Sequence, residues 1–348
     1  MAARTEYIRA SAPPWKTGSR HPYRRAKILT MPNPTVLFDL PNELLLQITK
    51  ELPRRSVFNF MRTSRLAQGI GHEILYHLSL QRKRGVFIWA GQNAQEQTML
   101  YLLDDILAAI PTNPEVGLEA LGAAATGGCN RVLRRLLQAG VNPNTRHNGS
   151  HALLQASTGR FPACTESVRI LLANGASTGA VDDTRGRSAL HWAASAGNSN
   201  IITVLLHAGM DINIRSSWAN ETPLILAAQR AHYRAAAVLV AAGANTSLPD
   251  YFGHTPLEHA ANNSILSLVQ LLVNNGANVD WQSLDGRTPL SFAVEHGSIH
   301  IVEFLVNSGC DVNLPDTYGK TPICRCKGNW FPWSKVQGII RNSPGYRG

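Results

Sequence analysis

The chain has 348 residues, of which 44% are hydrophobic and 16% are charged, so most of it can form a folded core. Its longest apolar run, residues 235–244, is too short and too rich in glycine and alanine to cross a bilayer, and we expect no membrane association. The net charge of +10 comes from the two ends, with +6 in residues 1–30, +6 in residues 317–348 and −2 in the body between them. This distribution argues against a nucleic-acid-binding body, although basic tails that contact nucleic acid or chromatin remain an alternative.

Residues 1–33 form a basic tail that we expect to be disordered, because it has scattered arginines and no hydrophobic periodicity. Starts that are rich in arginine and poor in acids are also typical of mitochondrial presequences. The pair Pro13-Pro14 disfavours the amphipathic helix that such a presequence needs. Met31 offers an alternative start, and the sequence leaves Met1 and Met31 both open.

Three short helices are predicted between residues 34 and 80. In the first, Leu44, Ile48 and Leu52 recur at helical spacing on one stripe, with Pro41 in the opening turn. Two further apolar segments follow, and the whole module has only about 45 residues, a size at which domains are marginally stable alone. A module of this kind usually depends on a partner.

This segment resembles the F-box, a short helical module. The resemblance is carried by Leu40-Pro41-x-Glu43, Ile48, Leu52, Val57, Phe60, and Thr63-Ser64-Arg65 in place of the family's Val-Cys-Arg. Leu66 and Ala67 stand where the family usually has a tryptophan. The resemblance implies docking onto a Skp-family adaptor of a cullin–RING ubiquitin ligase, with these adaptor contacts: Leu40, Pro41, Leu44, Ile48 and Leu52. The alternative is that these helices only cap the N-terminal end of the array that follows.

A period of 33 residues separates four threonines downstream, namely Thr222, Thr255, Thr288 and Thr321, and Ser188 lies 34 residues before the first of them. Threonine or serine can cap a helix, and the proline that follows the threonines suits the first helical position. A second helix carries an aliphatic run and ends at a glycine, as at Gly209, Gly243, Gly276 and Gly309. The Asp-x-x-Gly motif that comes next predicts a turn at Asp183, Asp250 and Asp316.

These repeats resemble the ankyrin repeat, and the fullest copy is GRSALHWAASAGN, with His191 in the family's histidine position. We expect an array over residues 85–342, with degenerate copies at 85–115, 116–146 and 148–182, clear copies at 183–215, 217–249, 250–282 and 283–315, a degenerate cap at 316–342 and a tail at 343–348. Asn220 and Ser264 replace turn glycines, and we expect less regular turns there. The predicted fold class is therefore all-α: a three-helix F-box-like module followed by an ankyrin α-solenoid with short β-hairpin fingers.

The sequence has no motif of a known catalytic, nucleotide or zinc site, so we expect no enzyme activity, cofactor, metal or small-molecule ligand. The pairs His254/His259 and His296/His300 occupy variable repeat positions with no carboxylate recurring beside them. The five cysteines are odd in number and irregular in spacing, which indicates free thiols in a reducing compartment, cytoplasm or nucleus.

Aromatic and apolar side chains recur at or near the predicted finger tips, and we expect them to bind a target protein: Trp218, Tyr251, Phe252, Trp281, Leu284 and Tyr318. The alternative is that each of them folds onto the next finger. The leading functional hypothesis is the substrate-recognition subunit of an SCF-type ubiquitin ligase, in which the ankyrin stack captures the target. The alternatives are an ankyrin scaffold without a ligase and the basic-tailed nucleic-acid or chromatin binder. The sequence does not name the target.

Overall fold

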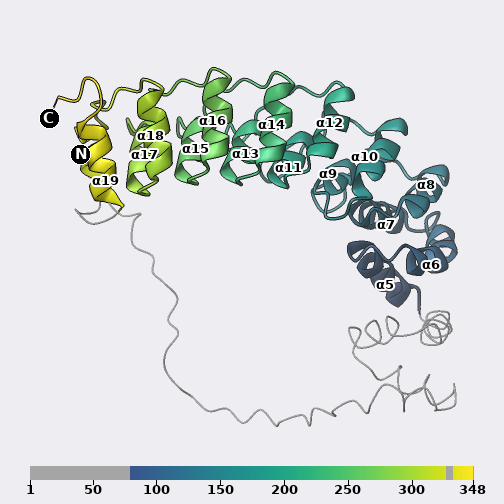
Figure 1. Cartoon of the computed structure of the whole chain (residues 1–348). Helices are drawn as coiled ribbons and strands as arrows, with labels where there is room; N and C mark the ends of the chain where they lie inside the picture. Colours follow the sequence, from purple (N-terminus) through teal and green to yellow (C-terminus); the bar gives the residue numbers. More distant parts are fainter. Residues whose placement is uncertain (1–78, 327–331, 348) are drawn as a thin grey trace, which may run out of the picture. The chain divides into compact units, whose positions relative to one another are not determined.

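The computed structural model describes residues 79–326 and 332–347, which belong to the second of the chain's two compact units, Leu75–Gly348. The basic tail and the F-box-like segment, with its predicted adaptor contacts, lie outside the described residues. The described chain is helical and has no strands, so the all-α class of the array is confirmed. Figure 1 shows its helices stacked in pairs along the chain.

Each pair has a first helix that packs on the first helices of its neighbours. These first helices are α5 (Leu80–Gln92), α7 (Pro114–Gly127), α9 (Ala152–Ser157), α11 (Ala189–Ser195), α13 (Pro223–Gln229), α15 (Pro256–Asn262), α17 (Pro289–Glu295) and the 3-10 helix η1 (Pro322–Arg325). The second helices form a parallel row of their own: α6 (Glu96–Ala109), α8 (Asn130–Gln138), α10 (Cys164–Ala173), α12 (Ser199–His207), α14 (Tyr233–Ala241), α16 (Leu266–Asn274), α18 (Ile299–Asn307) and α19 (Trp333–Arg341). The stretch 81–84, between the two predicted domains, is part of α5.

The recurring threonines begin the first helices as the sequence predicts. Thr222 Oγ1 accepts a hydrogen bond from the backbone N–H of Ile225, and proline occupies the first helical position after the cap. Thr255 and Glu258 form a reciprocal capping box at the start of α15. Because these caps satisfy backbone groups that have no partner inside the helix, seven-residue helices can form at the same place in the four clear repeats, as α11, α13, α15 and α17.

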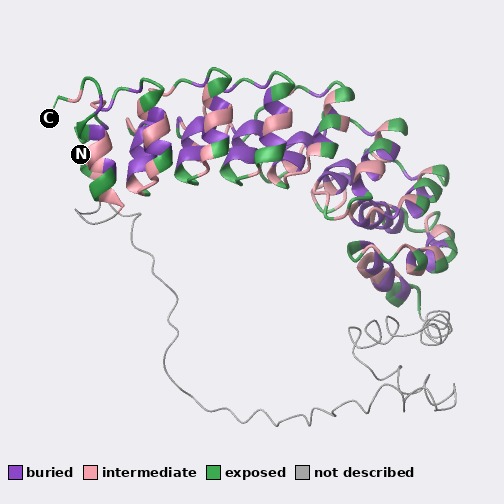
Figure 2. Cartoon of the chain, viewed as in Figure 1, coloured by how far each residue is buried: buried purple, intermediate pink, exposed green. Residues whose placement is uncertain are grey.

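The core of the array is a layer of small and aliphatic side chains between neighbouring pairs. In α13, for example, Leu224, Ala227 and Ala228 are almost fully buried, and small alanines allow α11 and α15 to approach on either side. Figure 2 shows buried residues along the whole row of first helices. No pair has a core of its own, so stability comes from contacts between neighbours.

The expectation of less regular turns at the replaced glycines is wrong. Between the helices of a pair, Ala231 and Ser264 adopt the same left-handed backbone as Gly197 and Gly297, with φ of 64° and 58°. The same two backbone hydrogen bonds recur in all four turns. Asn220 likewise keeps a φ of 54° in its finger. Neighbouring repeats impose the turn, and a non-glycine residue accepts a cost of about 1–2 kcal/mol to adopt it.

We predict that Leu224→Ala lowers the free energy of unfolding by about 2–5 kcal/mol, because it leaves a cavity between α13 and its neighbours. Urea denaturation of the full chain, followed by circular dichroism at 222 nm, measures the change. The matched control is Leu284→Ala, since Leu284 is 74% exposed and its truncation leaves no cavity. Equal losses in the two variants would contradict the layered core.

Candidate protein-binding surface

The fingers that join successive pairs are turns built around one polar side chain at their base. In the finger before α15, Asp250 Oδ1 accepts hydrogen bonds from the backbone N–H groups of Phe252 and His254, both at 2.9 Å. Two backbone hydrogen bonds, from Asp250 N to His254 O and from Gly253 N to Asp250 O, close the turn. Among the described fingers, isolated bridges occur at His147–Ser150 and Val181–Ser188, and none of these fingers has the strands of the expected β-hairpins, because so short a loop leaves room for few ladder hydrogen bonds.

The first Asp-x-x-Gly prediction was placed one residue too late. Asp182, not Asp183, is buried at the base of its finger, where its Oδ1 accepts from the N–H groups of Thr184 and Arg185. Asp183 is exposed and forms an ion pair with Arg146. This finger is one residue longer than the fingers at Asp250 and Asp316, so alignment to the glycine shifted the assignment.

The second carboxylate oxygen of each base aspartate is bound by a side chain four residues after the helix cap. The three donors differ chemically: Trp192 Nε1 to Asp182 at 3.1 Å, His259 Nε2 to Asp250 at 2.9 Å, and Arg325 to Asp316 at 2.5 Å. In the two fingers with a base serine, Ser216 and Ser283, the corresponding positions are Leu226 and Phe292. Among these five repeats, a side-chain donor therefore occurs in the three whose finger base is an aspartate, and an apolar residue occurs in the two whose base is a serine.

These contacts shape the acidity of the base aspartates. Burial alone would raise the pKa of Asp250, but the hydrogen bond from His259 and the backbone donors lower it below its ordinary value. The carboxylate is thus held ionised in its turn. Sequence reasoning missed these donors, although their recurrence at cap plus four was visible.

A backbone hydrogen bond ties each finger to the one before it. The N–H of one tip residue donates to a tip carbonyl of the preceding finger: Trp218 to Arg185, Tyr251 to Ala219, Leu284 to Phe252, and Thr317 to Asp285, at 2.9 to 3.3 Å. These four hydrogen bonds join five successive fingers into one continuous edge.

The side chains at this edge are exposed. We call the following set the finger-tip row: Trp218, Tyr251, Phe252, Leu284 and Tyr318. Their exposed fractions run from 61% for Phe252 to 83% for Tyr318. Within the row, Tyr251 and Phe252 meet edge to face with ring centroids 5.6 Å apart, and the guanidinium of Arg185 lies 5.6 Å from the Trp218 ring.

Trp281 stays out of the row. It is half-buried, and its Nε1 donates a hydrogen bond of 2.8 Å to the carbonyl of Gly253, in the preceding finger. Of the six residues predicted at or near the tips, the structure therefore brings five to one exposed edge and gives Trp281 an internal partner.

Comparison with known families matches this architecture. A model described as ankyrin repeats (3 copies) matches residues 121–216, 162–250, 216–280 and 260–329, more than half of the chain. The chain belongs to the ankyrin-repeat family. An F-box domain model matches residues 37–70, so this is an F-box plus ankyrin-repeat protein and a protein-interaction module.

Similar proteins match parts of this chain. The ankyrin repeat domain of Bcl-3, described as a unique member of the IkappaB protein family, superposes with a TM-score of 0.55 at 29% identity, covering 64% of this chain and 97% of that one. E3 ubiquitin-protein ligase KEG of Arabidopsis thaliana is 40% identical over 85 residues, which are 24% of this chain and 5% of the ligase. A putative ankyrin repeat-containing protein of Treponema pallidum (strain Nichols) is 41% identical over 83 residues, 24% of this chain and 28% of that protein. The chain thus spans only a small part of these two relatives.

The ankyrin histidine joins two repeats through buried hydrogen bonds. His191 Nδ1 lies 3.1 Å from Ser188 N, which donates to it, and 2.9 Å from Ser188 Oγ. Its Nε2 lies 2.9 Å from the carbonyl oxygen of Glu221, in the next repeat. The carboxylate of Glu221 pairs with Arg187 at 2.6 Å, and both side chains are buried. Burial lowers the pKa of His191 to about 4.

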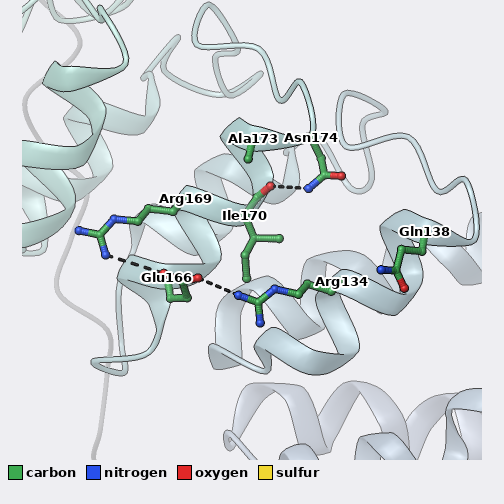
Figure 3. Close-up of a pocket in the computed structure, with 7 residues that line it drawn as sticks. All are labelled: Arg134, Gln138, Glu166, Arg169, Ile170, Ala173 and Asn174. Atoms are coloured by element: carbon green, nitrogen blue, oxygen red, sulfur yellow. Dashed lines mark hydrogen bonds and ion pairs between the residues drawn. The ribbon is translucent and has the colours of Figure 1, made fainter.

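A groove lies between the second helices α8 and α10 and is shown in Figure 3. It encloses about 360 Å³ and includes Arg134, Glu166 and Arg169 among its lining residues. Glu166 accepts a hydrogen bond of 2.8 Å from Arg134 and lies 3.8 Å from Arg169, so its charge is already balanced within the array. This groove is part of the contact between two repeats.

Two of the histidines singled out in the sequence form hydrogen bonds with side chains of the array. His259 binds Asp250, and His296 Nε2 lies 3.1 Å from Asn262 Oδ1. Nowhere in the described residues do three or more His, Cys, Asp or Glu side chains gather as a possible metal site. Every described helix also falls short of the length and apolar character that a membrane span needs.

We predict that His191 makes the array less stable in mild acid. Its pKa is about 4 in the fold and an ordinary 6.5 in the unfolded chain, so between these pH values only the unfolded chain takes up the proton. The contribution of His191 is full above about pH 6.5 and falls by about 1.4 kcal/mol for each pH unit below it, until about pH 4.

Urea denaturation of the wild type and of His191→Asn at pH 7 and pH 5 measures this effect. The stability advantage of the wild type should shrink by about 2 kcal/mol between the two pH values, since the variant has no imidazole to protonate at this position. An advantage that stays constant with pH would contradict the assignment.

Proposed function

We propose that the protein is the substrate-recognition subunit of an SCF-type ubiquitin ligase. The F-box docks a Skp-family adaptor, and the ankyrin stack captures the target protein. The observation that carries the proposal is the combination of an F-box match at residues 37–70 with an ankyrin array whose finger tips present exposed aromatic side chains. The partial similarity to a plant E3 ubiquitin-protein ligase supports it.

The predicted adaptor contacts all fall within the matched F-box segment, namely Leu40, Pro41, Leu44, Ile48 and Leu52. In this arrangement the chain has no active site of its own. F-box proteins are adaptors and ankyrin repeats are interaction modules, so transfer chemistry belongs to the other subunits of the ligase.

The finger-tip row is the surface that we assign to target capture. Its side chains expose apolar area without covering the core, and aromatic residues of this kind dominate the energy of protein interfaces. The base aspartates and the backbone links between fingers hold the tips in place, so little order has to be gained on binding.

We also place the protein in a reducing compartment, the cytoplasm or the nucleus. All five cysteines are free, and burial raises the pKa of Cys129 and Cys310 to about 12. Buried thiols with so high a pKa carry little thiolate and serve packing, as expected of reduced proteins.

We predict that Leu40→Ala with Pro41→Ala abolishes recovery of a Skp-family adaptor by the tagged full chain, because it removes the start of the predicted apolar contact. Co-purification from cells, quantified by immunoblotting, measures it. The control is the finger variant described next, which should recover the adaptor at the wild-type level. If the unmutated chain recovers no adaptor, the ligase proposal fails and the ankyrin scaffold without a ligase takes its place.

We predict that Trp218→Ala with Phe252→Ala weakens target capture and leaves the melting temperature nearly unchanged, since both side chains are exposed. Proximity labelling by the wild-type chain, with and without proteasome inhibition, identifies candidate targets as the neighbouring proteins that accumulate when the proteasome is inhibited. The double variant should label these proteins less than the wild type does. Tyr233→Ala, an exposed aromatic on α14, is the matched control and should change neither readout. Unchanged labelling, or unfolding of the double variant, would argue against a binding role for the row.

A further inference from the structure

The basic side chains of the array are of one kind. Between Arg84 and Gly319 the chain has thirteen arginines, and every Lys/Arg position in these 236 residues is arginine. The flanking lysines are Lys83, before this stretch, and Lys320, directly after it. The 85–319 part of the ankyrin array therefore carries its positive charge entirely on guanidinium groups.

Some of these arginines have a structural reason to be arginine. Arg187 forms a buried ion pair with Glu221, and the guanidinium of Arg287 lies 4.0 Å from the ring centroid of Phe292. A planar guanidinium suits both contacts better than an ammonium group. These positions account for only part of the pattern.

Other arginines have no such reason. Five are exposed and form neither an ion pair nor a ring contact with any described residue: Arg131, Arg160, Arg215, Arg230 and Arg234. At a solvated position without a partner, lysine has the same charge and a similar helix propensity, so folding does not select between the two. The preference for arginine over lysine at these positions therefore points to a chemical difference between the two side chains that does not act through the stability of the fold.

The lysine at the N-terminal end of the array is withheld from solvent. Lys83 is buried on α5, and its Nζ lies 2.7 Å from Asp105 Oδ2, with only 9% of the side chain exposed. Lys320 and Lys335 are exposed and lie after the last clear repeat. The remaining lysines, Lys16, Lys27, Lys50 and Lys327, lie outside the described residues.

One reaction that depends on the distinction between the two basic side chains is the transfer of ubiquitin. A lysine amine loses its proton, attacks the thioester carbonyl that joins ubiquitin to a conjugating enzyme, forms an isopeptide bond and releases the enzyme's cysteine thiol. Arginine cannot take part, because its delocalised guanidinium stays protonated in proteins.

We propose that the array from residue 79 to residue 319 is built without an accessible ubiquitin acceptor, so that a ligase transfers ubiquitin to the captured target and not to the surface that holds it. Self-modification is then confined to lysines outside this stretch, and Lys320 and Lys335 are its acceptors in the described chain. This inference rests on the proposed ligase function.

The test converts free arginines into amines without changing charge. The wild-type full chain and the variant with Arg215→Lys, Arg230→Lys and Arg234→Lys are each assembled with the Skp-family adaptor and the cullin–RING subunits. Activating enzyme, conjugating enzyme and ubiquitin are then added, and the modified sites are mapped by mass spectrometry. In the wild type, ubiquitin remnants should occur only at lysines outside residues 79–319. In the triple variant, remnants should appear at the substituted positions, and the variant should turn over faster in cells.

The matched control is Arg215→Gln, Arg230→Gln and Arg234→Gln, which changes the same positions and adds no amine, so it should gain no remnant. If the ligase assembles but the lysine variant gains no ubiquitin remnant at the substituted positions, the inference is overturned and the proposed function stands. Failure of the wild type to bind the adaptor removes the proposed function, and this inference with it.

An amine-reactive succinimidyl ester tests accessibility without any ligase. On the folded full chain it should label Lys320 and Lys335 and spare Lys83 until the chain is unfolded in urea. Labelling of Lys83 at the same rate as Lys335 in the folded chain would contradict the proposal, whatever the outcome with ubiquitin.

Discussion

No helix pair of this array can bury its apolar face without the next pair, and this constraint determines most of what the chain can do. Leu224 is covered by residues of neighbouring repeats as well as its own, and the alanines beside it are small because another helix lies against them. The apolar faces of the helices are therefore buried against neighbouring helices. Large apolar side chains remain exposed where stacking does not bury them, as at the finger tips, the surface proposed for target capture.

The fingers meet a second requirement, which is to hold exposed apolar side chains still. Asp250 fills its turn with a carboxylate bound by two backbone N–H groups and by His259, and the next finger donates to the carbonyl of Phe252. A flexible loop with the same side chains would lose much of its binding energy to ordering. The polar network at the finger bases therefore supports the surface above it, although it touches no partner itself.

How far the sequence predicts this structure depends on whether a feature is local. The period of 33 residues, the threonine caps and the glycine turns follow from single residues with strong backbone preferences, and the helices occur where these residues predict them. Features that depend on a neighbouring repeat are harder to predict from the sequence. Ser264 keeps the geometry of a glycine because the flanking helices impose it, and Asp182 rather than Asp183 fills its turn.

Trp281 illustrates the same limit at the candidate site. Its position near a finger made it resemble the exposed aromatics, and only the location of the Gly253 carbonyl, 28 residues earlier in the chain, shows that its indole has an internal partner. Tyr318 has a similar place in the sequence and remains exposed. Composition identifies residues that are able to bind, whereas exposure depends on hydrogen bonds between repeats.

The choice of basic residue combines both kinds of constraint. At Arg187 the fold requires a planar group that can enter a buried pair with Glu221, and lysine would leave the carboxylate with one point contact. At Arg230 or Arg234 nothing in the described structure distinguishes lysine from arginine, so the fold alone would permit either. Lys83 is the informative exception, because its amine is buried and paired with Asp105. Residues 79–319 therefore expose no lysine amine, which is the property expected of a surface that works beside a ubiquitin-transferring enzyme, as in the proposed function.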